Sequence, residues 1–149
     1  KLYDEVKEFK KTAGSTKVKA ILGVGDLETL RNVAKASLVC MMAGADFIKT
    51  STGKENINAN LNNSLVMLRM IRDFYNKTGK KIGFKPAGGI STSKSVLEFL
   101  ILVAEELGFE WINPKLLRIG ASSLLIDIER QLYHYTSGRY ANKEKLALG

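Results

Sequence analysis

The chain has 149 residues, of which 45% are hydrophobic and 26% charged, and these fractions are typical of a folded globular protein. A single cysteine, Cys40, excludes a disulfide framework, and no apolar run reaches the roughly 18 to 20 residues of a membrane-spanning helix. Because the amino terminus also has no apolar signal core, we expect a cytoplasmic protein that does not bind membranes.

The charge balance indicates an anionic partner. Lys and Arg number 23 against 15 Asp and Glu, which gives a net charge of +8. The only tight basic pairs are Lys10-Lys11 and Lys80-Lys81, whereas nucleic-acid binders usually cluster basic residues and interleave aromatic ones. We therefore expect small phosphorylated metabolites as partners, with nucleic-acid binding as the weaker alternative.

Hydrophobic periodicity predicts an alternation of helices and short strands. The chain begins with an amphipathic helix over residues 1–14. Strands are then expected at residues 17–24, 46–50, 82–85 and 117–120. The helices between and after them are expected at residues 27–43, 61–75, 93–107 and 122–135. Asp26 is the expected N-cap of the second helix, and residues 136–149 are expected to form a polar tail.

The spacing of the strands predicts the fold class, α/β of the (β/α)₈ TIM-barrel type. Their centres lie 27, 36 and 35 residues apart, which implies parallel strands in either an open doubly wound sheet or a closed barrel. Glycine turns after two consecutive strands favour the barrel, where they would follow strands seven and eight. A complete barrel takes about 250 residues. We therefore expect residues 1–149 to be its carboxyl-terminal half, strands five to eight, completed by a missing half or a second chain.

Two lysines stand at the carboxyl ends of neighbouring strands, where catalytic side chains of such barrels project. They are Lys49 and Lys85. Two ammonium groups about 6 Å apart repel each other by about 2.8 kcal/mol at a dielectric constant of about 20, which leaves one of them partly neutral at mildly basic pH. A neutral amine is the nucleophile that forms a Schiff base with a carbonyl group. The alternative is that both lysines reach solvent or only bind a substrate phosphate.

Polar glycine turns after three strands predict a phosphate site at the same end of the sheet. They supply backbone N–H groups, two serine hydroxyls and a lysine. The residues are Thr52, Gly53, Lys54, Gly88, Gly89, Gly120, Ser122 and Ser123. Each turn alone is explained as well by the needs of a tight turn, whereas three equivalent turns favour binding. His134 and Cys40 stand in no metal-ligand pattern, so no metal or cofactor is expected.

Three segments resemble the signatures of the deoxyribose-phosphate aldolases, a family of class I aldolases with a (β/α)₈ barrel. They are residues 45–54, 83–89 and 118–123, in the family's order and spacing. The resemblance covers residues 18–140 and the carboxyl-terminal half of the family's barrel. Two positions depart from the pattern, since Ser91 stands where the family usually has arginine and Val24 where it usually has threonine.

The resemblance implies a lyase that reversibly cleaves 2-deoxyribose 5-phosphate to glyceraldehyde 3-phosphate and acetaldehyde, without a cofactor. It implies that Lys49 forms the Schiff base and that Lys85 is the second lysine, which keeps the first partly neutral and joins proton transfer. Thr52 would lie beside the substrate, and the residues of the glycine turns would bind its phosphate. The family's proton-relay aspartate belongs to the other half. The alternative is therefore a phosphate-binding half-barrel without catalysis, acting as a scaffold or subunit.

Overall fold

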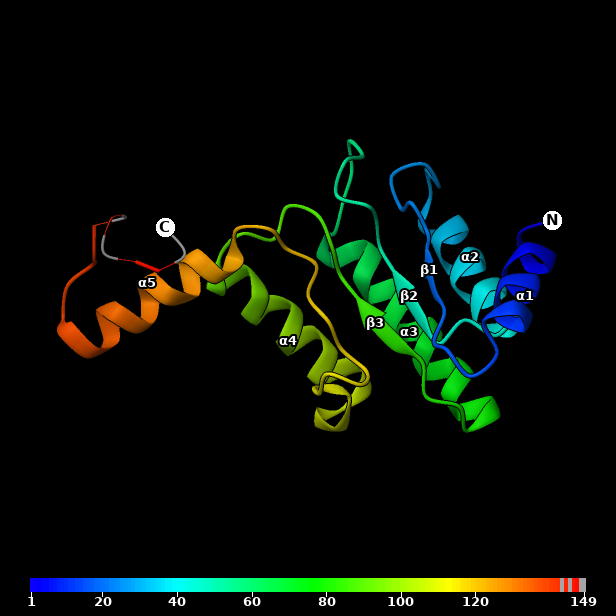
Figure 1. The fold of residues 1–149 in the computed structure, drawn as a ribbon. Coiled ribbons are helices and arrows are strands. Elements are labelled where there is room, and N and C mark those ends of the chain that lie inside the picture. Colours follow the sequence, from blue (N-terminus) through cyan, green and yellow to red (C-terminus); the bar gives the residue numbers. More distant parts are fainter. Residues whose placement is uncertain (143, 145, 148–149) are drawn as a thin grey trace.

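The computed structural model describes residues 1–142, 144, 146 and 147, and its helices and short strands alternate as the sequence predicts (Figure 1). In this part of the chain no helix is both long and apolar enough to cross a membrane. The elements are α1 (Leu2–Ala13), β1 (Lys19–Ile21), α2 (Leu30–Met42), β2 (Phe47–Lys49), α3 (Leu61–Thr78), β3 (Gly83–Lys85), α4 (Ser93–Leu107), the 3₁₀ turn η1 (Phe109–Trp111) and α5 (Leu124–Ser137).

The strands form one parallel sheet in the order β1-β2-β3, which confirms the predicted parallel pairing. Side chains alternate between the two faces of a strand, so residues in register share a face. One face therefore carries two rows across the sheet, Lys19-Phe47-Gly83 and Ile21-Lys49-Lys85. We call this the inner face, because the helices lie on the other side of the strands (Figure 1).

The opposite face of the sheet carries the core. Ile48 and Phe84 are fully buried there and belong to one apolar cluster with side chains of the helices. The helical residues of this cluster with no exposed surface are Met67, Leu68, Ile71 and Val103. The cluster holds the strands against α2, α3 and α4, and so fixes the positions at which the strands end and the site begins.

The start of α2 differs from the prediction. Asp26 is not its N-cap; the helix begins at Leu30, and the side chain of Thr29 accepts a hydrogen bond from the N–H of Asn32. Glu28 adopts a φ of 61°, in the left-handed region, so the helical backbone cannot continue back to residue 27. The helix is therefore three residues shorter at this end than its apolar periodicity suggests.

The predicted fourth strand at residues 117–120 is present only as two isolated parallel bridges to the β3 segment, Phe84 to Leu117 and Ala87 to Gly120. The Phe84 carbonyl accepts from the N–H of Arg118, and the Pro86 carbonyl accepts from the N–H of Gly120. Pro86 itself has no N–H, so it cannot donate the next hydrogen bond of the ladder. The segment still runs alongside β3, and it brings Gly120 to the site.

Asp46 joins α1 to the sheet through two hydrogen bonds. Its Oδ2 accepts from Lys10 Nζ at 2.8 Å and from the Val18 N–H at 2.9 Å. Burial alone would raise the pKa of Asp46, but the hydrogen bonds from Lys10 and Val18 outweigh it and hold that pKa below its ordinary 3.8. The carboxylate therefore stabilises the fold as an anion.

We expect Asp46→Asn to lower the free energy of unfolding at neutral pH by about 2 kcal/mol, because it removes a charge-assisted hydrogen bond. The folded pKa lies below the unfolded one, so this contribution is fully present above about pH 4 and is lost as the pH falls through the folded pKa. Urea unfolding at pH 7 and pH 3 measures it. Equal stability of variant and wild type at pH 7 would contradict the assignment.

The end of the chain differs in part from the predicted polar tail over residues 136–149. Helix α5 continues to Ser137 and ends at Gly138, which has the left-handed φ of a C-terminal cap. Leu146 is buried, and the N–H of Ala147 donates to Glu129 on α5, so these residues fold back onto the helix. Residues 143, 145, 148 and 149 lie outside the described part.

Candidate active site

Lys49 and Lys85 end β2 and β3 and lie directly opposite each other in the parallel register. Both are partly buried on the inner face. Burial, followed by the charges of Lys49 and Arg118, lowers the pKa of Lys85 below the ordinary 10.5 of lysine. The charge of Lys49 therefore contributes, after burial, to the lowered pKa of Lys85, the residue to which the resemblance assigns proton transfer.

A cavity of about 550 Å³ opens beside Lys49 at this end of the sheet. The structure gathers around it Lys49 and all eight residues of the predicted phosphate turns. Lys85 does not line it, and four further residues do so: Ala87, Ile90, Ser91 and Ala121. The three glycine turns, which are far apart in the sequence, thus surround one space.

Buried hydroxyl groups hold the first turn against the second. Thr50 Oγ1 accepts from the N–H of Ala87 at 2.9 Å, and Ser51 Oγ donates to the Ala87 carbonyl at 2.7 Å and to Asn58 Oδ1 at 2.9 Å. Both hydroxyls are inaccessible to solvent. These hydrogen bonds were not predicted from the sequence. The only signal for them is that a threonine and a serine directly follow a strand.

Gly120 leaves the space that Lys85 occupies. A Cβ atom built at residue 120 would lie 3.0 Å from Lys85 Cε and closer still to Ala87 Cβ. Gly88, with a left-handed φ of 92°, faces the Asn58 side chain in the same way. These glycines are therefore required by close approach at the floor of the site, which is a structural need beside the predicted binding role.

The third turn leads into α5. Ser123 precedes the helix but makes no side-chain capping hydrogen bond, so its hydroxyl is not engaged in capping. Asp127, in the first turn of α5, accepts hydrogen bonds from the N–H and the hydroxyl of Ser93 at 2.7 and 2.6 Å. These bonds hold the start of α5 beside the start of α4, so that both helix N-termini lie near the cavity.

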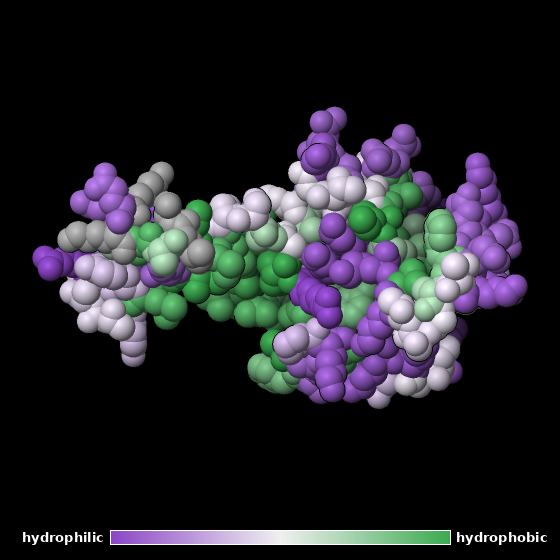
Figure 2. Space-filling view, in the orientation of Figure 1, coloured by the Kyte–Doolittle hydropathy of each residue, from purple (hydrophilic) through white to green (hydrophobic). Residues whose placement is uncertain are grey.

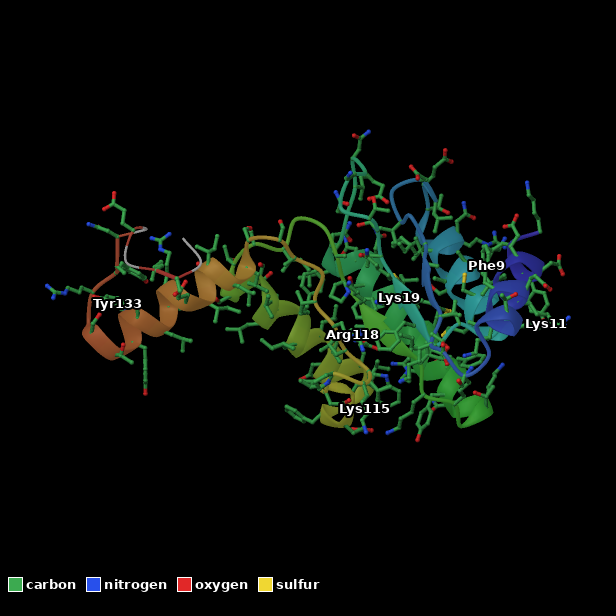
Figure 3. All side chains as sticks on the ribbon, in the orientation of Figure 1. Phe9, Lys11, Lys19, Lys115, Arg118 and Tyr133 are labelled. Atoms are coloured by element: carbon green, nitrogen blue, oxygen red, sulfur yellow. The ribbon has the colours of Figure 1, made fainter. Side chains whose placement is uncertain are left out.

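Cations gather around the Phe47 ring on the inner face, among them Lys19 and Arg118, which are labelled in Figure 3. The Phe47 ring has Lys17 Nζ at 5.9 Å, Lys19 Nζ at 5.6 Å and the Arg118 guanidinium at 5.4 Å from its centroid. Burial and the charges of Lys85, Arg118 and Lys49, in that order, lower the pKa of Lys19. None of the ion pairs recorded for the described residues involves these cations.

Gly83 explains how Phe47 fits on this face. A Cβ atom at residue 83 would overlap the Phe47 ring, which lies directly across from it in the register. Gly83 lies on the same face of β3 as Lys85, and the Phe47 ring fills the space that its missing side chain leaves. The ring supports the cations around it and separates them from the core.

Arg118 acts on the site through its charge. We expect Arg118→Gln to raise the pKa of Lys85 toward the ordinary 10.5 of lysine, since one nearby positive charge is removed. Lys115→Gln is the matched control, because Lys115 lies away from the inner face near η1 (Figure 3). Titration of the Lys85 Cε signal by NMR measures the change. A pKa that moves down, or by the same amount in both variants, would contradict this role.

The acidic residue nearest the phosphate turns is Glu55, which the sequence analysis did not consider. Its Oε1 accepts from the Thr52 N–H at 2.9 Å, and its Oε2 accepts from the N–H groups of Thr52, Gly53 and Lys54 at 3.0, 3.1 and 3.2 Å. These bonds, that of Thr52 foremost, lower the pKa of Glu55 to about 2. Three backbone donors of the predicted phosphate cradle are therefore held by a carboxylate.

The structure thus combines a parallel α/β sheet, two lysines at the carboxyl ends of neighbouring strands and a glycine-lined cavity at the same end. This arrangement is the one expected of part of a (β/α)₈ barrel. The sequence profile of the DeoC/LacD family aldolases matches residues 1–125, and the chain belongs to this family.

Curated relatives agree with this assignment. The chain is 64% identical to the deoxyribose-phosphate aldolase of Mus musculus and 62% identical to that of Homo sapiens, in each case over 140 residues. Each match covers 94% of this chain and 44% of the relative. The chain therefore spans less than half the length of the curated relatives that it matches.

Solved structures share the fold. A protein of Toxoplasma gondii ME49 provisionally assigned as a deoxyribose-phosphate aldolase has a TM-score of 0.78 at 23% identity, over 93% of this chain and 53% of that one. The aldolase QR15 has a TM-score of 0.63 at 27% identity, over 90% and 52% of the two chains. Both cover about half of the solved chain, which is consistent with part of a (β/α)₈ barrel.

Proposed function

We propose that the protein containing this chain is a class I deoxyribose-phosphate aldolase and that Lys49 is its Schiff-base residue. The observation that carries the proposal is that Lys49 lines a glycine-lined cavity and lies opposite Lys85 in the parallel register. The aldolase family and the names of the relatives support the same reaction. The cytoplasm is the compartment we propose for it.

The reaction follows from the chemistry of an amine at this position. Lys49 Nζ attacks the C1 aldehyde of open-chain 2-deoxyribose 5-phosphate, and loss of water gives an imine. Removal of the C3 hydroxyl proton breaks the C2–C3 bond, which releases glyceraldehyde 3-phosphate and leaves an enamine on Lys49. Protonation of C2 and addition of water then release acetaldehyde. Lys85 is suited to exchange these protons, because its pKa is lowered toward the working pH.

The phosphate of the substrate would lie among the three turns. The residues predicted for these turns all line the cavity. Gly53, Gly88, Gly89 and Gly120 would let the backbone approach the phosphate, Lys54 and the hydroxyls of Ser122 and Ser123 would add donors, and Thr52 would lie beside the sugar. Ser91 also lines the cavity. As the shorter residue in place of the family's usual arginine, it leaves more of the binding to the backbone and Lys54.

The remaining half of the barrel, or a second chain, would complete the site. Leu97 and Ile101 on α4 and Leu125 on α5 are 56%, 61% and 62% exposed, and apolar side chains gather where these two helices meet (Figure 2). The inner face in turn carries Lys19 and Arg118, which form no ion pair with any residue that the structure describes. We propose that the missing strands cover both surfaces and bring the carboxylate that the family uses as a proton relay.

A cleavage assay tests the function. The purified natural protein is incubated with 2-deoxyribose 5-phosphate, and the release of acetaldehyde and glyceraldehyde 3-phosphate is followed with and without a chelator. We expect equal release in both cases, because lysine chemistry needs no metal. Phosphate binding without any release of acetaldehyde would instead support the non-catalytic scaffold and overturn the proposal.

A further inference from the structure

The Glu55 carboxylate binds backbone donors of residues that line the proposed site, although Glu55 itself does not line the cavity. It binds the N–H groups of Thr52, Gly53 and Lys54, and all three of these residues line the cavity beside Lys49. Consecutive N–H groups that converge on one point form an anion-binding nest. In the free protein this nest is already filled by a group of the chain itself.

The carboxylate matches the nest imperfectly. Three N–H groups converge on Oε2, at 3.0, 3.1 and 3.2 Å, although one carboxylate oxygen offers only about two lone-pair directions. A phosphate monoester carries three terminal oxygens and a charge near −2 at neutral pH, so it can give each N–H its own acceptor. A phosphate dianion therefore satisfies these donors better than Glu55 does.

The loop also has anchors that do not involve the Glu55 side chain. Ser51 anchors its start to Ala87 and Asn58, and Asn58 Nδ2 donates to the Glu55 carbonyl at 2.6 Å. The only atom of Glu55 in these contacts is its backbone carbonyl oxygen, and its side chain takes no part in them. The loop can therefore keep its shape when the carboxylate leaves, which is the condition for an exchange of one anion for another.

We propose that Glu55 is an internal anion that occupies the nest of residues 52–54 until a phosphate dianion displaces it. This inference rests on the proposed phosphate site and goes further, because it makes Glu55 a specificity-determining residue. A monocarboxylate cannot satisfy the N–H donors of the nest better than Glu55 already does, and a neutral sugar carries no charge to bind there. The exchange therefore favours phosphorylated aldehydes over carboxylated or unphosphorylated ones.

Binding of inorganic phosphate to the natural full-length protein, measured by calorimetry at pH 8, tests the proposal. The variant Glu55→Gln keeps the shape of the side chain and removes its charge, and Glu98→Gln removes a charge from the exposed side of α4 as the matched control. We expect Glu55→Gln to bind phosphate about fivefold to tenfold more tightly, and Glu98→Gln to stay within about twofold of wild type.

A competition arm tests the preference between anions. Acetate, a monocarboxylate like Glu55, is expected to weaken phosphate binding to Glu55→Gln and to leave binding to the wild type unchanged. Amide NMR signals of Thr52, Gly53 and Lys54 are expected to move on phosphate addition in the wild type. Without phosphate, they are expected to move on the Glu55→Gln substitution.

Three results would overturn the proposal: unchanged affinity in Glu55→Gln, weaker affinity in both Glu55→Gln and Glu55→Ala, or no phosphate binding by any form. Weaker phosphate affinity in both variants would show that the Glu55 carboxylate stabilises the loop. Because no substrate takes part, the outcome is separate from that of the proposed reaction. A protein that never forms an imine can still show the tighter binding, and an active aldolase can fail to show it.

Discussion

Replacement of Lys49 by methionine lowers the rate of 2-deoxyribose 5-phosphate cleavage by about 10⁴-fold or more, because the imine can no longer form. Methionine keeps most of the side-chain volume at this partly buried position, so the fold should be retained. A steady-state assay of acetaldehyde release measures the loss.

Lys54→Met is the matched control for that variant, since Lys54 lines the same cavity. It removes the same charge but not the proposed nucleophile. We expect a higher KM for the phosphorylated substrate and a kcat within about tenfold of wild type. Equal loss of kcat in the two variants would show that charge in the cavity, and not the amine of Lys49, carries the reaction.

Trp111→Ala lowers the free energy of unfolding by about 3 to 5 kcal/mol, the range found when a large aromatic core side chain is truncated. Trp111 is 1% exposed, its ring meets Tyr75 edge-on at a centroid distance of 5.2 Å, and its Nε1 donates to the Ile82 carbonyl at 3.0 Å. Denaturant unfolding measures the change.

Trp111→Phe separates packing from hydrogen bonding. Phenylalanine keeps an aromatic ring next to Tyr75 but leaves the buried Ile82 carbonyl without its donor, so we expect a loss of about 1 to 3 kcal/mol. Because Ile82 directly precedes β3, which ends at Lys85, the site should loosen along with the fold. A Trp111→Ala variant as stable as Trp111→Phe would contradict the packing argument.

The lysine pair could be predicted because it depends on two regular features of the backbone. Strands at a regular spacing predict parallel neighbours, and the alternation of side chains places Lys49 and Lys85 on one face once each strand is aligned by its last residue. The glycine turns follow from the same logic, because the carboxyl ends of parallel strands meet at one edge. These local rules also located most of the helices.

The other parts of the site depend on contacts that no local rule supplies. Arg118 and Lys19 reach the inner face only through the register of their segments and the Phe47 ring between them. Glu55 reaches the cradle because the loop after Thr52 curls back on itself. The fourth strand is present only as two bridges, because Pro86 has no N–H to continue the ladder. The apolar periodicity of the sequence carries no information about this effect.

Borohydride trapping tests the central claim most directly. The natural protein is incubated with 2-deoxyribose 5-phosphate and sodium borohydride, which reduces an imine to a stable secondary amine, and its peptides are mapped by mass spectrometry. We predict an adduct on the peptide that contains Lys49 and a loss of activity in proportion to labelling. An adduct on Lys85 or another lysine alone, or an active protein that is never labelled, would contradict the account.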